Sequence, residues 1–305
     1  MQKKALNLAV CRGLWLPLLL VPVLATGAAS AQSSPLLWGG NQSPINITPP
    51  GATTVPTFTK TADLGNKTTY TLKNTTGMNW CKDNVACEGT IDNRWGSLKA
   101  YPPEKPTPTD YPPSITFGGV LYTLKEFHFH SPAEHLLNGH LAKMEIHFVF
   151  HKNGVSDCSA SEYLVIGQLI VEGAAPNPEL LKIFGPGVKL PGPGQSVPIA
   201  PFIIGNVLRN FPAGTSSYRY AGSLTAPAEI PSCGIPPSGP AIPNQLGTGY
   251  LPEVVSWVLL TTPLTMSADQ IALFQKLFPN GDARSPQKIV RQRVMMGRDS
   301  PIPRN

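Results

Sequence analysis

Two stretches of the chain have the apolar and polar patterning of half-buried β-strands. Residues 122–130 and 143–151 are rich in Phe, Val and Ile and alternate with polar positions, a pattern that predicts one strand in each stretch. Between them, Asn138-Gly139 is a strong signal for a tight turn. The pattern therefore predicts two neighbouring strands joined by a hairpin-like return.

Three histidines lie on these predicted strands. Successive side chains of a strand point to opposite faces, so His128 and His130 share one face and the phenylalanines beside them take the other. If the strands lie side by side, His147 joins them. Three protein nitrogens with an open fourth position describe a catalytic zinc site, whereas structural zinc sites use four protein ligands, usually with cysteines.

Two carboxylates strengthen this interpretation. Glu145 precedes His147 by two residues, and Glu126 precedes His128 by two, so each shares a face with its histidine. A metal-bound histidine usually donates its second ring N–H to a carboxylate or a carbonyl. The alternative is that His-x-His is simple alternation on a half-solvated strand, but this alternative leaves the paired carboxylates unexplained.

With these residues in view, the chain resembles the alpha-class carbonic anhydrases, in particular secreted bacterial ones. The resemblance extends over most of the chain after Trp38 and implies a mainly β protein with peripheral helices, built as a single domain on a large, twisted, mostly antiparallel sheet of about ten strands. Four segments carry it, in the family's order: Gln42-Ser43-Pro44-Ile45-Asn46-Ile47, Glu126-Phe127-His128-Phe129-His130-Ser131-Pro132-Ala133-Glu134-His135, Glu145-Ile146-His147-Phe148-Val149 and Tyr218-Arg219-Tyr220-Ala221-Gly222-Ser223-Leu224-Thr225.

The resemblance implies a zinc enzyme that reversibly hydrates carbon dioxide to bicarbonate and a proton, by attack of zinc-bound hydroxide. His128, His130 and His147 would bind Zn²⁺. Thr225 would accept a hydrogen bond from the hydroxide and pass its own proton to Glu134.

The family also has an apolar wall that holds carbon dioxide beside the metal and a buried structural histidine. His135 matches that histidine and is not counted as a ligand. The residues that match the wall are Val149, Val165, Leu224 and Trp257.

The chain departs from the family at the proton shuttle. Efficient members carry a histidine at the pocket mouth, and the matching position here is Met78. A thioether does not carry a proton at neutral pH, so no shuttle is evident. His140 and His151 are alternatives, although a surface position is the simpler interpretation of both.

A second departure is an insertion rich in proline and glycine, at about residues 228–250. Its composition is typical of an irregular surface loop. The insertion is either a tolerated loop extension or a lid or partner-binding surface near the pocket rim.

The N-terminus has the pattern of a targeting segment. Basic residues precede the apolar stretch 14–24, and Ala29-Ser30-Ala31 offers a small-residue cleavage site. The apolar core is shorter than the roughly 20 residues of a membrane span, and a signal-anchor is the alternative. We expect a signal peptide at 1–31, a carbonic anhydrase domain at 32–305, no membrane span after cleavage, and a secreted or periplasmic protein.

Four cysteines follow the predicted cleavage site, an even number that suggests two disulfides in an oxidising compartment. Three pairings are open; we favour one within the first two cysteines and one between the last two. Zinc binding is the rival interpretation, but their spacing lacks a Cys-x-x-Cys pair. The four are Cys81, Cys87, Cys158 and Cys233.

Charge and the C-terminal pattern add two points. The net charge of +6 comes without a long Lys/Arg cluster, so nucleic-acid binding is not expected. Ser267 with Gln270 forms a capping box, followed by an apolar stripe that ends at Pro279-Asn280-Gly281, which predicts a helix.

The oligomeric state does not follow from the sequence.

Two other functions are compatible with the pattern. The same hydroxide could hydrolyse activated esters, which we expect only as a side activity. A non-catalytic relative could use the fold for binding, but such relatives typically lose a zinc histidine, and all three are present here.

Overall fold

The structure is a computed structural model that describes residues 40–48, 58–62, 64–76, 96–154, 161–208, 216–226, 251–290 and 292–298. All of these residues belong to the unit Ser33–Asn305. The strands are β1 (Asn46–Ile47), β2 (Phe58–Ala62), β3 (Thr68–Asn74), β4 (Leu98–Tyr101), β5 (Ser114–Phe117), β6 (Val120–His130), β7 (Leu136–Leu137), β8 (His140–Leu141), β9 (Met144–Lys152), β10 (Tyr163–Glu172), β11 (Ser196–Phe202), β12 (Ser216–Gly222), β13 (Val255–Met266) and β14 (Met295–Arg298). The helices are α1 (Leu181–Phe184), α2 (Ile204–Val207) and α3 (Ala268–Leu277).

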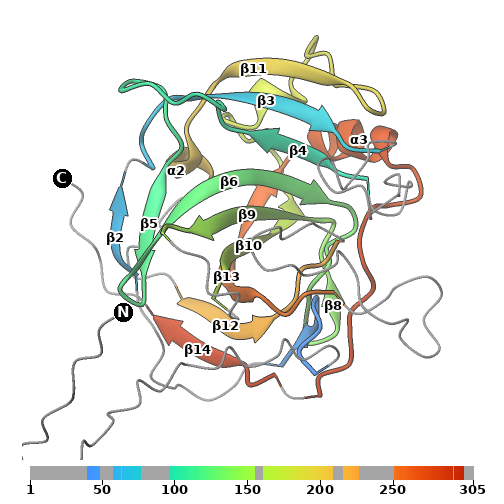
Figure 1. The fold of residues 1–305 in the computed structure, drawn as a ribbon. Helices are drawn as coiled ribbons and strands as arrows, with labels where there is room; N and C mark the ends of the chain where they lie inside the picture. Colours follow the sequence, from blue (N-terminus) through green and yellow to red (C-terminus); the bar gives the residue numbers. More distant parts are fainter. Residues whose placement is uncertain are drawn as a thin grey trace, which may run out of the picture. The chain divides into compact units, whose positions relative to one another are not determined.

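One large sheet dominates the fold (Figure 1). Its 11 strands follow the order β11-β3-β4-β6-β9-β10-β13-β12-β14, with β5 joining β2 to β6. Among the described strands of this sheet only β10 and β13 pair in parallel, and every other pair is antiparallel. A second, small sheet has the strand order β1-β7-β8. The prediction of a mainly β protein on a large, mostly antiparallel sheet is confirmed.

The large sheet buries a different set of side chains on each face. One face carries an aromatic core around Phe127, whose ring lies 5.1 Å from that of Phe202 and 5.2 Å from that of Tyr70, between centroids. The other face carries a smaller apolar cluster around Val165 and Trp257. Because strand side chains alternate, a single strand such as β6 contributes to the core with one set of residues and to the opposite face with the other.

Strand β6 contains an irregularity that matters for this division. Its pairing with β9 shifts register between Leu124 and Glu126, which leaves the exposed Lys125 as the extra residue of a β-bulge. Before the bulge Leu124 belongs to the core, and after it Phe127 does. The bulge therefore shifts the core-facing positions of β6 from even to odd residue numbers. After the bulge, the even-numbered residues of β6 face the opposite side of the sheet.

Helix α3 begins with the predicted capping box. The Ser267 hydroxyl accepts a hydrogen bond from the Gln270 N–H at 3.4 Å, and the Gln270 side chain accepts one from the Ser267 N–H at 3.2 Å. The buried Phe274 of this helix packs on the aromatic core, 6.1 Å from the Phe129 ring. In the described part of the chain, no helix is long and apolar enough to cross a membrane.

Several predictions fall on residues outside the described ranges, and they stay predictions. These are the signal peptide at 1–31, the missing shuttle at Met78, the insertion at about 228–250 and the disulfides of Cys81, Cys87, Cys158 and Cys233.

The contribution of the α3 capping box to stability can be tested by substitution of Ser267. Replacing Ser267 with Ala removes the acceptor for the Gln270 N–H, and we expect the free energy of unfolding to fall by about 1 kcal/mol. Ser267→Asp keeps a capping oxygen and should unfold like the wild type. Urea unfolding of the three proteins measures the difference, and equal midpoints for the Ala and Asp variants would contradict the role of the cap.

Candidate metal centre

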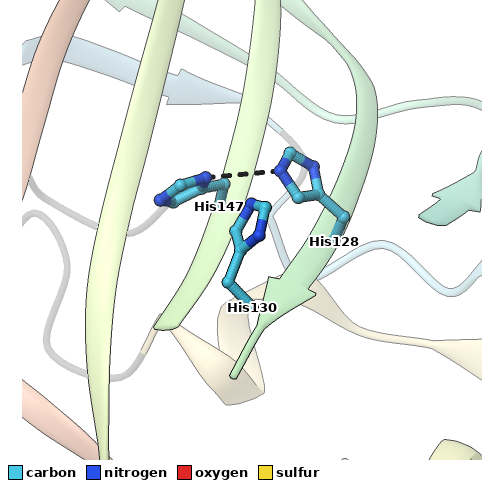
Figure 2. Close-up of side chains that lie close together, drawn as sticks. All are labelled: His128, His130 and His147. Atoms are coloured by element: carbon cyan, nitrogen blue, oxygen red, sulfur yellow. Dashed lines mark hydrogen bonds between the residues drawn. The ribbon is translucent and has the colours of Figure 1, made fainter. Parts of the chain in front are cut away.

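Three imidazoles meet on the face of the sheet opposite the aromatic core. His128 and His130 end strand β6, and His147 lies on β9 directly opposite His128 in the antiparallel register. Figure 2 shows the three rings turned toward one another from the two strands. One ring nitrogen from each lies within 4.8 Å of the other two. Alternation along two paired strands is what brings the three together.

The inward-facing nitrogens can be identified from the contacts. Nε2 of His128 lies 3.3 Å from Nδ1 of His147, the contact drawn as a dashed line in Figure 2. Nε2 of His130 is buried and has no hydrogen-bond partner among the described residues. A buried polar atom without a partner costs about 1–3 kcal/mol. A metal ion at this point would satisfy all three nitrogens.

Each ring also has a partner for its outward nitrogen. Nδ1 of His128 lies 2.8 Å and 3.0 Å from the two carboxylate oxygens of Glu126. Nε2 of His147 lies 2.9 Å from Oε1 of Glu145. When each outward N–H donates to its acceptor, the inward nitrogen carries the lone pair, as metal ligation requires.

The outward partner of His130 is a backbone group that no sequence pattern predicts. Its Nδ1 lies 3.2 Å from the carbonyl oxygen of Asp282. The Asp282 side chain is fixed nearby, because its Oδ1 accepts the Ser131 N–H at 2.9 Å. Ser131 and Asp282 are separated by 151 positions in the chain, and no local pattern indicates such a contact.

Burial and the neighbouring charges keep the His128 ring neutral and the Glu126 carboxylate ionised. Burial lowers the pKa of His128 to about 3, against the opposing effect of Glu126. Burial alone would raise the pKa of Glu126, but His128 and Lys99 outweigh it and lower that pKa to about 2. At neutral pH the pair is therefore an imidazole and a carboxylate, the forms that suit a metal ligand and its supporting acceptor.

Glu145 is the most densely bonded carboxylate near the rings. Its Oε2 accepts the N–H groups of Glu134 and His135 at 2.9 Å and 2.8 Å. Its Oε1 lies 2.8 Å from Nδ1 of His135 and 2.9 Å from Nε2 of His147. Burial would raise the pKa of Glu145, but the two histidines hold it well below its usual value.

His135 is fully buried, and each of its ring nitrogens has a hydrogen-bond partner outside the three rings. Its Nδ1 contacts Glu145, and its Nε2 lies 2.6 Å from the Tyr220 hydroxyl. That hydroxyl is also bonded to Ser43 at 3.1 Å. Through the Tyr220 hydroxyl, His135 is connected to Ser43 of the N-terminal segment Gln42–Ile47.

Glu134 and Thr225 are both buried. Oε1 of Glu134 accepts the Arg284 N–H at 2.8 Å, and its Oε2 lies 3.6 Å from Nε2 of His130. Within the described ranges Oε2 has no hydrogen-bond partner, so the structure contains no hydrogen bond from Thr225 to this atom. The proton relay between the two residues remains a prediction.

Apolar residues border the rings on one side. Val165 of β10 pairs with Val149 of β9 and with Trp257 of β13, and all three are buried in one cluster against which Leu224 packs. The Trp257 ring lies 5.0 Å from that of His147, and its indole N–H donates to the Ser223 carbonyl at 2.9 Å. The predicted wall residues are thus contiguous and adjoin the third histidine.

The two histidines considered as alternative shuttles lie elsewhere. His140 is exposed in the short strand β8, and His151 is half-buried at the end of β9, with its Nε2 2.7 Å from a carboxylate oxygen of Glu162.

A large, mostly antiparallel sheet with three converging imidazoles describes a β protein with a candidate metal centre, and comparison with known proteins identifies the family. Residues 30–231 match the family model of the eukaryotic-type carbonic anhydrases. A carbonic anhydrase of Pectobacterium carotovorum is 30% identical over 170 residues, 55% of each chain, and one of Klebsiella pneumoniae is 28% identical over 177 residues, 58% of each. The chain spans little more than half the length of the curated relatives it matches. The protein belongs to the carbonic anhydrase family.

A solved structure shows the same fold. The alpha-carbonic anhydrase of Photobacterium profundum superposes with a TM-score of 0.57 over 84% of this chain and 89% of its own, at 21% identity. At this level of identity the likeness concerns the fold alone.

Gly167 gives a test of how closely the residues around Glu145 are packed. It pairs with His147 across β9 and β10, and a Cβ added there would come within 2.9 Å of Oε1 of Glu145 and of a Leu259 methyl group. We expect Gly167→Ala to lower the free energy of unfolding by about 1–3 kcal/mol and to weaken metal binding, because Glu145 must move. Gly65→Ala, which meets no atom within 4 Å, is the control.

Urea unfolding and zinc titration of the two variants measure both effects. A Gly167→Ala protein that unfolds and binds zinc like Gly65→Ala would contradict the close packing.

Proposed function

We propose that the protein is a zinc-dependent carbonic anhydrase that reversibly hydrates carbon dioxide to bicarbonate and a proton. The observation that carries the proposal is the convergence of one nitrogen each from His128, His130 and His147, with Nε2 of His130 buried and unpartnered among the described residues. Three neutral nitrogens without a thiolate match the donor set of catalytic zinc. Family membership supports the same reaction.

The three histidines would hold the ion, and the groups behind them would hold the histidines. Glu126, the Asp282 carbonyl and Glu145 each accept an outward ring N–H, which fixes the tautomers and the ring planes. When bound, zinc supplies a hydroxide nucleophile at neutral pH. Because the ligands are neutral, the ion keeps its full charge for that purpose.

The remaining residues would handle the substrate and the proton. Carbon dioxide is small and nonpolar, and the contiguous apolar surface of Val149, Val165, Leu224 and Trp257 beside His147 suits it better than a charged clamp would. Thr225 would orient the nucleophile and pass its hydroxyl proton toward Glu134. The unpartnered Oε2 of Glu134, 3.6 Å from Nε2 of His130, is an acceptor close to the metal centre.

We further propose that the protein acts outside the cytoplasm, in the periplasm or the extracellular space. The basic, apolar and small-residue segments at the N-terminus support this location.

The function can be tested by removing one ligand. His130→Ala should lower both the zinc content and the rate of carbon dioxide hydration by more than about tenfold, because the ion loses one of three protein donors. His140→Ala changes an exposed histidine away from the rings and should keep both. Stopped-flow hydration and zinc content are measured on the same samples. A folded, zinc-loaded wild type without hydration activity would overturn the enzymatic proposal.

The proposed absence of a shuttle at Met78 gives a separate prediction. Turnover of the wild type should rise with buffer concentration, because buffer must carry the proton that a thioether does not. Met78→His should increase turnover in weak buffer and have little effect in strong buffer. A variant with normal zinc content and unchanged turnover in weak buffer would refute the shuttle argument.

A further inference from the structure

A lysine lies next to the metal centre on the same face of the sheet. Lys99 of β4 is the direct antiparallel partner of His128, and side chains of such partners share a face. Its Nζ lies 3.2 Å from Oε1 of Glu126, with the Lys99 side chain 23% exposed and that of Glu126 9% exposed. The lysine thus reaches from the partly solvated side of the sheet to a carboxylate that supports a ring.

The three outward acceptors differ in how they are fixed. The Asp282 carbonyl is part of the backbone. Glu145 is fixed independently of its metal-centre histidine by two backbone N–H groups and by His135. Glu126 has, in the described part of the chain, a single hydrogen-bond partner besides His128, and that partner is Lys99. The position of Glu126 therefore depends on one cation.

The geometry points to Lys99 as a positioning residue of the metal centre. We propose that its ammonium group holds the Glu126 carboxylate against Nδ1 of His128, and so fixes the orientation in which the His128 ring presents Nε2. This inference rests on the proposed function, because it concerns how the same site holds its metal. Lys99 would act on the site only through Glu126 and not by direct contact with metal or substrate.

The energetics favour this role over a chance surface pair. A carboxylate that is removed from water is costly unless it is paired and hydrogen-bonded. Oε1 of Glu126 is shared between Nζ of Lys99 and Nδ1 of His128, at 3.2 Å and 3.0 Å. Without the lysine, the carboxylate would lose the contact that opposes its rotation toward solvent, and the ring would lose a fixed acceptor.

The neighbouring strand supplies a matched control. Lys73 of β3 is the direct partner of Lys99 on the side away from His128, so it carries the same charge on the same face. Its Nζ lies over the Tyr101 ring, 5.0 Å from the centroid, and not on Glu126. A general effect of positive charge near the site would appear in both lysine variants, whereas a positioning effect would appear only at Lys99.

The experiment measures zinc release from the zinc-loaded full chain into an excess of chelator. Glu126→Ala, which removes the acceptor of the His128 N–H, should release zinc about tenfold faster, the lower end of the effect of removing a partner that supports a metal ligand. Lys99→Met should release it about threefold faster, as expected for a partly exposed ion pair. Lys99→Arg, which keeps the cation, and Lys73→Met should both release zinc at the wild-type rate. If Lys99→Met folds poorly, Lys99→Gln gives the same comparison.

A double variant tests whether Lys99 acts through Glu126. In the Glu126→Ala background, Lys99→Met should cause no further acceleration, because the side chain that the lysine positions is gone. The His128 ring N–H resonance in the proton spectrum of the zinc-loaded protein should move in Lys99→Met and stay unchanged in Lys73→Met. A purely structural role of the lysine would leave that resonance in place.

Four results would overturn the inference while leaving the proposed function intact: wild-type release by Lys99→Met, equal acceleration by the two lysine variants, full acceleration by Lys99→Met in the Glu126→Ala background, or an unmoved His128 resonance in Lys99→Met. A wild-type chain that retains no zinc would instead overturn the proposed function, and the inference with it.

Discussion

The antiparallel register of β6 and β9 is the constraint on which the metal centre depends. His128 lies opposite His147 in this register, and the side-chain period of a strand is two residues. A slip of one residue would turn His147 toward the aromatic core and a core phenylalanine toward the centre. The register is held because Phe127 pairs with Phe148 on the core face, with ring centroids 5.8 Å apart. Packing on one face therefore fixes chemistry on the other.

The bulge at Lys125 extends this coupling to the charged partner. Without an extra residue, the face that carries Leu124 would continue through Glu126 and His128 into the core. The register shift between Leu124 and Glu126 reverses the faces, so Glu126 stands beside His128 and Lys99. The sequence indicated that Glu126 and His128 share a face, because they are two residues apart, but the bulge itself left no recognisable signal in the pattern of residues.

The features that the sequence predicted are local in the chain, whereas those that it did not predict join distant segments. Alternation within two short stretches predicted the strands and the shared face of His128 and His130, and a capping box predicted the start of α3; these are local patterns. The parallel pairing of β10 with β13, the Asp282 carbonyl behind His130 and the Lys99 contact join segments far apart in the chain. Such contacts depend on the order of strands in the sheet, which local periodicity does not contain. The resemblance to a family supplied the sheet, but not these individual partners.

The charges around the rings indicate why this arrangement suits a divalent cation. Four carboxyl groups, those of Glu126, Glu134, Glu145 and Asp282, are buried beside the imidazoles. Fewer cations lie near them: Nζ of Lys99 contacts Glu126, and the buried Arg284 donates its backbone N–H to Glu134. Burying an excess of acidic groups is unfavourable unless positive charge offsets it. Neutral imidazoles do not supply that charge, whereas a dication at their centre would. A ligand that binds only the folded state stabilises it in proportion to the logarithm of its concentration over its dissociation constant, so the centre that would perform the chemistry would also, once loaded, stabilise the acidic shell built around it.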